Sequence, residues 1–447
     1  MTQHNEIVLD RSDYSASLNS AADSLRADAE KALKRLLNKD CPGSEFTGWI
    51  DWPKNHGIKL ANEIITWRDQ LKVSYDCVVV IGIGGSYLGT RAVVDLLTPE
   101  FLDSGDSQKT SNQKIKKVLF AGHNMSETSL SDLLGYLEHR KPMICVVSKS
   151  GTTTEPGVAF RVLNEWCRKK FGHVESTQRI VAITDPKQGA LRKFANDQSY
   201  KAFDIPSDVG GRYSVFTAVG LVPIALAGFN IHDFVSAADE VFANALGRTK
   251  GPHLNFILEY AQCRQAAWRA GKIIEVVTYP EPRMRNLVEW FKQLFGESDG
   301  KNNKGLFPGS LECTMDLHSM GQYLQEGSRT MIETFMTARN PRRKDQRIAV
   351  PKTGSNIDEL LYLEGKGIDD INAIAVKATK KAHSEGGVPA LEISLPDLEI
   401  TTIARLFAAL QISCPVGGLM MGINPFDQPG VEAYKKNMFA MLGKPAK

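Results

Sequence analysis

The sequence predicts an α/β protein of two domains, each with a mainly parallel sheet flanked by helices. The run Tyr75–Ile83 is continuously apolar and β-branched, as in a strand buried on both faces. Similar runs follow at 118–121, 143–147 and 179–184, each separated from the next by helix-length sequence. This alternation favours a parallel sheet covered by helices. At 447 residues, the chain is also too long for a single core.

A second block repeats the alternation towards the C-terminus. Lys272–Tyr279 is predicted to be a strand, Met284–Phe295 an amphipathic helix and Arg347–Val350 another strand. Ala390–Ser394 then precedes the long helix pattern Thr401–Ala409. We therefore expect a second α/β domain with the same kind of sheet as the first.

The two domains are expected to divide near residues 220–250, and the sequence before Leu71 is helix-rich without a strand series of its own. The predicted organisation is an N-terminal helical segment that packs on the second domain (1–70), a first α/β domain (71–225), a second α/β domain (226–420) and a C-terminal helical segment (421–447).

The composition is that of an ordinary soluble globular protein. Hydrophobic residues make up 42% and charged residues 23%, and the formal net charge is only +3. So small a charge gives no indication of a nucleic-acid or membrane surface. The short basic run 342–344 is followed at once by Asp345 and is interpreted as a solvated loop.

Targeting and metal signals are absent from the sequence. The N-terminus carries Glu6, Asp10 and Asp13 and lacks the apolar core of a signal peptide. The most apolar stretch, Val215–Ile231, is interrupted by Pro223 and is predicted to be a buried helix with a turn. The seven cysteines are scattered without a C-x-x-C pair, and the nine histidines lack metal-ligand spacing. We therefore expect a cytoplasmic protein without a disulfide framework or a metal site.

The first predicted strand ends in a glycine-rich turn, Gly82–Gly89 (GIGGSYLG). The backbone N–H groups of such a turn, where it opens a helix, can approach an anion. The spacing is not G-x-G-x-x-G, because Tyr87 stands where glycine is needed, and it is not a P-loop, because Thr90 follows Gly89. Alone, the turn predicts either an anion site or merely tight packing of strand against helix.

The third predicted strand ends in a loop rich in hydroxyl groups, Ser148–Pro156 (SKSGTTTEP). Hydroxyls together with helix N–H groups can bind a phosphate dianion without a cationic side chain. The alternative is a helix cap, which needs only one Ser or Thr. The excess of hydroxyls favours phosphate binding, at the same edge of the sheet as the glycine-rich turn.

An arginine and a glutamate are the main candidates for chemistry. Two glycines before Arg212 allow a sharp turn that projects a guanidinium, which can stabilise developing negative charge. Gln293 and Glu297 are four residues apart at the end of an amphipathic helix, so they share one face and can present a carboxylate base to a cleft. Taken singly, Arg212 could equally form a surface ion pair and Glu297 could be a solvated side chain in a turn.

Two histidines and a lysine are weaker candidates. His318, in DLHSMGQ, and His383, in HSEGGVP, compete by residue type, and a lone histidine is more often structural than catalytic. Lys435 lies one turn into a predicted helix after a Pro-Gly turn, where it could reach a hydroxyl or ring oxygen or could simply be exposed.

Together these segments resemble the glucose-6-phosphate isomerase family over nearly the whole chain beyond residue 75. Two are highly specific: DVGGRYSVFTAVG at Asp208–Gly220 and FDQPGVEAYKK at Phe426–Lys436. The GIGGS turn, the SKSGTTTE loop and the GESDGK segment occur in the expected order. The length matches the compact bacterial type, and the stretch before His318 lacks the G-T-N-G-Q-H wording of longer forms.

The resemblance implies two sugar-isomerase-type domains, a homodimer, and reversible conversion of glucose 6-phosphate to fructose 6-phosphate through a cis-enediolate, in glycolysis and gluconeogenesis, without metal or cofactor. It implies that Glu297 transfers the proton, that Arg212 stabilises the enediolate and that Gln293 contacts the sugar chain. Ring opening would involve Lys435 and a histidine, for which His318 is preferred to His383. This histidine would come from the neighbouring subunit. The implied phosphate site consists of Gly85, Ser86, Ser148, Ser150 and Thr153.

Two other classes of protein compete with an isomerase. A regulator that binds sugar phosphates would keep the hydroxyl-rich loop, but it has no need for Arg212, Glu297 and Lys435 together. A nucleotide-dependent dehydrogenase is disfavoured by the glycine spacing of the first turn.

Overall fold

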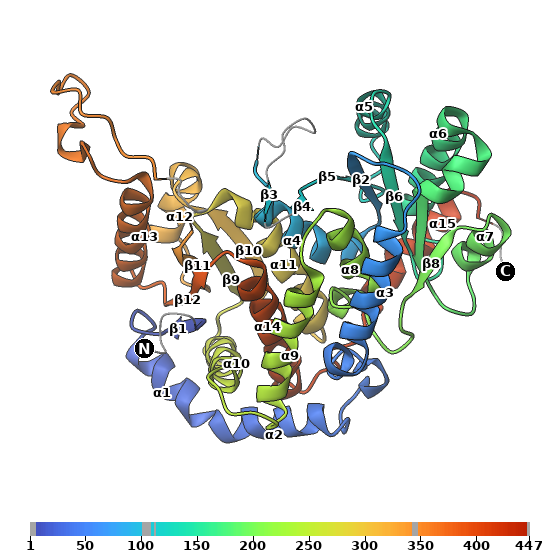
Figure 1. The fold of residues 1–447 in the computed structure, drawn as a ribbon. Helices are drawn as coiled ribbons and strands as arrows, with labels where there is room; N and C mark the ends of the chain where they lie inside the picture. Colours follow the sequence, from blue (N-terminus) through green and yellow to red (C-terminus); the bar gives the residue numbers. More distant parts are fainter. Residues whose placement is uncertain (1–5, 101–108, 111–112, 342–346, 445–447) are drawn as a thin grey trace.

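A computed structural model describes residues 6–100, 109–110, 113–341 and 347–444, and it contains two five-stranded sheets with helices packed between and around them (Figure 1). Seven of the eight pairs of neighbouring strands in these sheets are parallel, so the predicted α/β fold with two mainly parallel sheets is confirmed. The basic run 342–344 lies outside the described residues.

The first sheet has the strand order β5-β2-β6-β7-β8. Every residue of β2, β6 and β7 is buried, as expected for strands covered on both faces. Its strands are β2 (Cys77–Ile81), β5 (Lys117–Ala121), β6 (Pro142–Val147), β7 (Ile180–Thr184) and β8 (Lys201–Asp204). Its helices are α4 (Leu88–Leu97), α5 (Glu127–Leu137), α6 (Thr154–Arg179) and α7 (Ala190–Asp197), and a small hairpin pairs β3 (Lys109–Thr110) with β4 (Gln113–Lys114).

This strand order fixes where a ligand would bind. The chain moves from β2 outwards to β5 and then returns to the other side of β2 to form β6. The order of the strands therefore reverses between β2 and β6, and open α/β sheets bind ligands at the carboxyl ends of the strands on either side of such a reversal. The loops at that point are the glycine-rich turn and the hydroxyl-rich loop.

The second sheet has the order β1-β12-β11-β9-β10, with only β1 antiparallel to its neighbour. Its strands are β1 (Val8–Asp10), β9 (Ile274–Tyr279), β10 (Phe307–Glu312), β11 (Met331–Asn340) and β12 (Ala390–Asp397). The helices on this side are α1 (Ala16–Ser24), α10 (His253–Arg269), α11 (Arg285–Asp299), α12 (Gly321–Glu326) and α13 (Ile368–Glu385).

One prediction about this half is corrected. Arg347–Val350 is not a strand: Ala349 forms only an isolated bridge with Gly367, and the strand of this region is β11. The N-terminal segment, predicted to be helix-rich without a strand series of its own, contributes one short edge strand, β1, to the second sheet.

One apolar core joins the two sheets. It runs from Val80 and Val181 of the first sheet, through the helices between them, to Ile332 and Leu391 of the second. The helices that fill this space are α8 (Ala218–Leu226), α9 (Ile231–Ala245) and α14 (Ile400–Met420). The stretch Val215–Ile231 is a buried helix followed by a turn, as predicted. Among the described helices, α14 has the length and apolarity of a membrane span, and 89% of the window concerned is buried within the protein.

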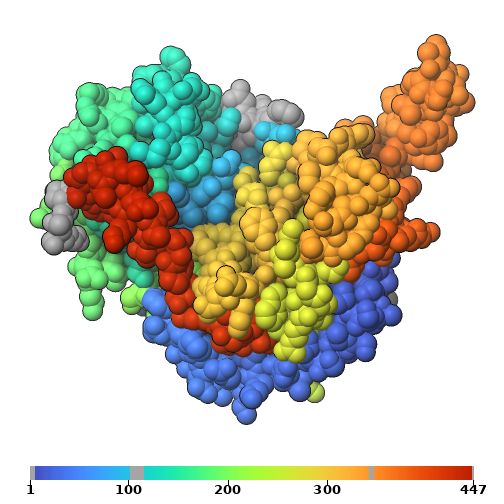
Figure 2. All heavy atoms as spheres, turned by 180° about the vertical axis from the view of Figure 1, so that it is seen from behind, coloured from blue at the N-terminus to red at the C-terminus, as the bar shows by residue number. Residues whose placement is uncertain are grey.

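The remaining helices lie at the periphery. In the N-terminal segment α1 packs on α10 and α2 (Arg26–Leu37) on α14, whereas α3 (Ile58–Asp69) packs on α8 and α9. The C-terminal helix α15 (Glu432–Met441) lies against the first domain (Figure 2). Between β11 and α13, residues 347–367 extend away from the body as a projecting arm (Figures 1 and 2).

Candidate active site

The loops after β2 and β6 enclose a pocket of about 710 Å³ at the reversal of the first sheet. Ser86, Ser148, Ser150 and Thr153 all line it, so four of the five residues predicted to hold a phosphate are brought together. Asp185, at the end of β7, also lines the pocket. The backbone N–H groups of Lys187 and Gln188 hydrogen-bond its carboxylate and lower its pKa.

The hydroxyl-rich loop is shaped by its own side chains. Ser148 Oγ accepts a hydrogen bond from the Gly151 N–H (3.0 Å), and Ser150 Oγ accepts one from the Thr152 N–H (3.1 Å). Thr153 occupies the N-cap position of α6, but its side chain makes no capping hydrogen bond. The loop is therefore more than a helix cap: it presents several hydroxyls at the first turn of a long helix, which is the arrangement that suits an anion.

Gly85, the fifth predicted phosphate residue, connects this pocket to the arginine turn. A Cβ atom at position 85 would lie 2.1 Å from the Gly211 carbonyl carbon and 2.7 Å from the Arg212 nitrogen. Any larger residue would push the two loops apart, so glycine is required by close backbone approach. Because Ser86 follows directly, the turn that lines the pocket packs directly on the turn that carries Arg212.

Arg212 is buried, with 2% of its side chain exposed, and its guanidinium contacts the candidate base. Nη1 donates to Glu297 Oε2 at 3.1 Å and to Gln428 Oε1 at 2.8 Å. Nη2 donates to the carbonyl oxygens of Pro425 and Asp427. Arg212 is thus no ordinary surface ion pair: it joins the turn after β8, the end of α11 and the C-terminal segment.

Glu297 lies in the last turn of α11, where its side chain remains about one-third exposed. Gln293 Nε2 donates to Glu297 Oε1 at 3.0 Å, so the two side chains share one helix face as predicted. A Cβ atom at Gly84 would lie 3.0 Å from the same Gln293 nitrogen. The carboxylate is therefore held by an arginine on one oxygen and an amide on the other, beside the turn that leads to the pocket.

Two residues that contact Arg212 were not singled out from the sequence. Ser298 Oγ accepts a hydrogen bond from Arg212 Nε at 2.9 Å, and Gln428 accepts one from Nη1. Both lie inside segments with a strong family pattern, GESDGK and FDQPGVEAYKK. The sequence could have indicated these two residues only by their position next to the candidate residues, because the chemistry of a serine or a glutamine gives no reason to choose them.

Among the described residues, neither His318 nor Lys435 forms a hydrogen bond or ion pair with Glu297, whose partners are Arg212 and Gln293. A Cβ atom at Gly296 would lie 3.5 Å from Pro308, so the next residue, Glu297, lies beside the start of β10. His318 follows the end of that strand, in an exposed turn. Six strand residues span roughly 20 Å. Lys435, on α15, forms an ion pair with Glu432 at 2.8 Å.

His383, the competing histidine, has a structural environment. It is buried on α13, and its Nδ1 lies 2.8 Å from Glu333 Oε2 of strand β11. Thr278 also donates to Glu333, so the histidine belongs to a polar cluster inside the second sheet. A histidine enclosed in this way cannot meet a substrate, which favours His318.

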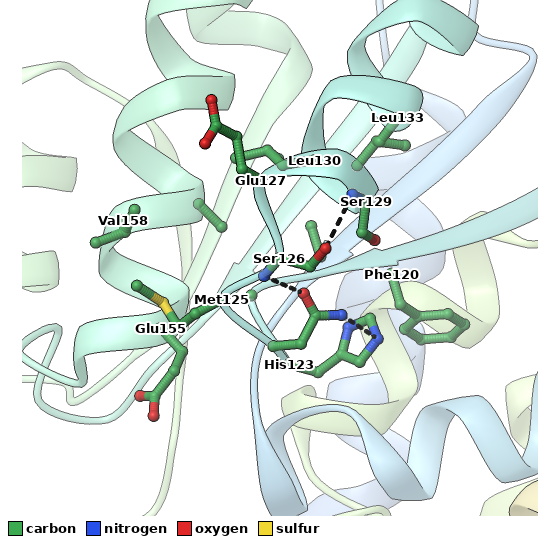
Figure 3. Close-up of a pocket in the computed structure, with 14 residues that line it drawn as sticks. Phe120, His123, Met125, Ser126, Glu127, Ser129, Leu130, Leu133, Glu155 and Val158 are labelled. Atoms are coloured by element: carbon green, nitrogen blue, oxygen red, sulfur yellow. Dashed lines mark hydrogen bonds between the residues drawn. The ribbon is translucent and has the colours of Figure 1, made fainter.

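A second cavity in the first domain, of about 210 Å³, contains none of the predicted site residues (Figure 3). It lies between the end of β5, α5 and α6, and its wall includes Leu130, Leu133 and Val158. Within the described residues, no group of three or more His, Cys, Asp or Glu side chains is arranged to hold a metal ion. The pocket after β2 and β6 is therefore the candidate site, because, of these two cavities, it is the one lined by predicted site residues.

A carboxylate and a buried arginine beside a hydroxyl-lined pocket, in a protein with two mainly parallel sheets, are the arrangement of a sugar-isomerase type of α/β protein. A family model described as phosphoglucose isomerase matches residues 58–445. The chain belongs to the phosphoglucose isomerase family.

Curated relatives support this membership over almost the full length. The glucose-6-phosphate isomerase of Alkaliphilus metalliredigens is 45% identical over 416 residues, covering 93% of this chain and 91% of the relative. That of Heliobacterium modesticaldum is 43% identical over 432 residues, covering 96% and 94%.

Solved structures support the fold. A hypothetical protein from Thermus thermophilus has a TM-score of 0.85 at 26% identity, with 98% of this chain and 100% of that chain covered. A glucose-6-phosphate isomerase from Chlamydia trachomatis has a TM-score of 0.68 at 20% identity, covering 87% and 73%.

Proposed function

We propose that this chain performs the reaction of its family, the reversible isomerisation of glucose 6-phosphate and fructose 6-phosphate, with Glu297 as the proton-transferring base. The observation that carries the assignment of the base is the contact between Glu297 and the buried Arg212, next to the hydroxyl-lined pocket. Glu297 takes the proton from C2 of the opened sugar and returns it to C1. Arg212 stabilises the negative charge on the enediolate between these steps.

The phosphate is proposed to bind in the pocket at the reversal of the first sheet. Hydroxyls of Ser86, Ser148, Ser150 and Thr153 and the first turn of α6 supply hydrogen-bond donors to the anion. Gly85 keeps the pocket close to Arg212, and Gln293 lies between that turn and Glu297, where it can contact the sugar chain. Binding energy at the phosphate then holds C1 and C2 at the base.

Ring opening is proposed to need a second subunit. His318 is exposed and lies at the opposite end of β10 from Glu297, so it suits a partner's site better than its own. The projecting arm supports a homodimer, because it exposes several large apolar side chains that a partner would cover. These are Ile348, Ile357, Leu360, Leu361 and Tyr362. Lys435 is proposed to assist at the ring oxygen when the complete site forms.

The domain boundaries and the location of the protein are also proposals. The division into segments 1–70, 71–225, 226–420 and 421–447 is supported by the first sheet, which spans residues 77–204, and by the second, whose strands lie within residues 274–397 apart from the edge strand β1. A cytoplasmic location is supported by the glycolytic role of the family and by the ordinary composition.

A coupled assay tests the proposed function. Purified protein receives fructose 6-phosphate in the presence of a chelator and no nucleotide, and glucose 6-phosphate is then detected with a separate dehydrogenase. We expect turnover with the wild-type protein and a much lower rate with Glu297→Gln. Binding of fructose 6-phosphate without turnover would favour a regulator, and turnover that depends on an added nucleotide would favour a dehydrogenase.

A further inference from the structure

Ser298, the residue after the candidate base, is fully buried and lies between two groups of the arginine turn. Its Oγ accepts from Arg212 Nε at 2.9 Å and lies 3.3 Å from the Tyr213 hydroxyl. Burial raises the pKa of Tyr213 well above its usual range, so this hydroxyl keeps its proton. Ser298 therefore links a cation to a neutral phenol inside the protein.

The five hydrogen bonds of Arg212 divide into two groups. A guanidinium has five N–H donors in one plane, and each of them has an acceptor here. Ser298 and the Pro425 carbonyl accept from Nε and Nη2 in fully buried contacts, and the Asp427 carbonyl accepts from Nη2 in a partly buried one. Nη1 donates to the side chains of Glu297 and Gln428, so this nitrogen is the one on the side of the candidate base.

Because the donors of a guanidinium are coplanar, fixing Nε fixes the direction of Nη1. We propose that Ser298 is a positioning residue, which sets the plane of Arg212 so that Nη1 points at Glu297 and the reacting carbons. This inference rests on the proposed function, because it assumes that Glu297 and Arg212 act on the substrate. Ser298 itself does not line the pocket, and the hydrogen bonds to the Glu297 carboxylate come from Arg212 and Gln293.

The end of α11 keeps Ser298 in place. The next residue, Asp299, is fully buried and accepts a hydrogen bond from Arg264 Nη1 at 2.7 Å. Arg264 Nε also donates to Glu275 of strand β9 at 2.6 Å. A charged cluster that joins α10, α11 and β9 therefore anchors the helix end, and Ser298 cannot move away from Arg212 without disturbing it.

Tyr213 holds the other side of the contact. Its ring stacks on Trp49 with centroids 4.7 Å apart, and its hydroxyl faces Ser298. Arg212 and Tyr213 are neighbours in η5 (Gly211–Tyr213), so one serine receives both side chains of the turn. A hydroxyl that only filled space would not need to meet both polar groups.

The test compares Ser298→Ala with Ser413→Ala. Ser413 is also buried, on α14, but its hydroxyl has no hydrogen-bond partner among the described residues, so its removal is a matched control. Fructose 6-phosphate formed from C2-deuterated glucose 6-phosphate is analysed by NMR for deuterium at C1, together with kcat and KM. For Ser298→Ala we expect a fall in kcat of about 10- to 100-fold, a KM near the wild-type value and a smaller fraction of deuterium transferred. Ser413→Ala should match the wild type in all three quantities.

Two further variants separate positioning from folding. Ser298→Thr keeps the hydroxyl and should restore much of the transferred fraction, whereas Ser298→Cys is close in size but a weak acceptor and should behave like Ser298→Ala. If Ser298→Ala changes kcat only in proportion to the folded fraction, with an unchanged deuterium transfer, the inference is wrong. Absence of isomerisation by the wild-type protein would instead overturn the proposed function, and the inference with it.

Discussion

Arg212 Nη1 lies 3.1 Å from Glu297 Oε2, although the two residues are 85 positions apart in the chain. Arg212 belongs to a turn after the last strand of the first sheet, and Glu297 ends a helix of the second. The pair therefore forms only when the two sheets have packed through their common core. The arrangement of these two side chains therefore depends on the folding of the whole chain.

Glu297→Gln should lower kcat by about 10²- to 10⁴-fold, because the amide cannot accept the C2 proton. Binding of fructose 6-phosphate, measured by calorimetry, should remain close to that of the wild type, since the phosphate pocket is unchanged. Exchange of the C2 hydrogen with D₂O, followed by NMR, should disappear. Glu289→Gln, on the same helix in an exposed ion pair with Lys292, is the control. Retained C2 exchange in Glu297→Gln would remove this residue as the base.

Arg212→Lys should lower kcat by about 10²- to 10³-fold, because lysine keeps the charge but loses the planar set of donors. The KM should change little, since the phosphate is held elsewhere. Arg248→Lys, which alters a half-exposed ion pair with Asp51, should leave both constants unchanged. Equal kcat values for the two variants would show that charge alone suffices at position 212.

His318→Ala should impair turnover of cyclic glucose 6-phosphate much more than turnover of the open-chain form, which a rapid-mixing experiment can separate. Equal losses of turnover with the cyclic and open-chain forms would show that His318 has a role other than ring opening.

Mixing subunits of His318→Ala and Glu297→Gln tests whether His318 serves the neighbouring subunit's site. If His318 serves the neighbouring site, each mixed dimer contains one intact site, and random exchange restores about a quarter of wild-type activity. If both residues act within one chain, mixing restores none.

Arg264→Met should destabilise the protein by about 3–5 kcal/mol in urea unfolding, because Glu275 and Asp299 would lose the buried cation between them. Burial raises the pKa of Asp299, so the folded state binds protons more tightly than the unfolded state at this group. Arg264 opposes this rise, so its removal should raise the pKa of Asp299 in the folded variant further. The deficit of the variant should therefore grow as pH rises through the range in which this carboxyl ionises, and shrink as pH falls below it. Arg269→Met, on the exposed side of the same helix, should cost less than about 1 kcal/mol.

The strands that were predicted correctly are those whose burial can be read directly as apolar sequence. Strand β2 is buried at every residue and is continuously β-branched. Strand β11 was missed, and the carboxylate of its buried Glu333 is satisfied by Thr278 and His383 inside the sheet. Strand β10 was missed because FPGSLE contains proline and glycine, which an edge strand tolerates. Such partners come from distant parts of the chain, so local pattern cannot predict them.

The site was predictable to the extent that its residues carry distinctive chemistry. The hydroxyl-rich loop and the glycines before Arg212 could be identified from the sequence. By contrast, the roles of Ser298 and Gln428 depend on where Arg212 points, which only the packing of three chain segments determines. The distance between Glu297 and His318 within one chain likewise follows from the direction of β10, not from residue type.

The backbone contact at Gly85 has a consequence for the choice of substrate. It ties the pocket proposed for the phosphate closely to the turn that carries Arg212, so the proposed function implies a set distance between the bound anion and the base. Such a site would select substrates by length: a sugar phosphate reacts when the number of bonds from phosphorus to C2 matches that distance. Shorter or longer chains can bind by the same phosphate and still leave their reactive carbons out of register with the carboxylate.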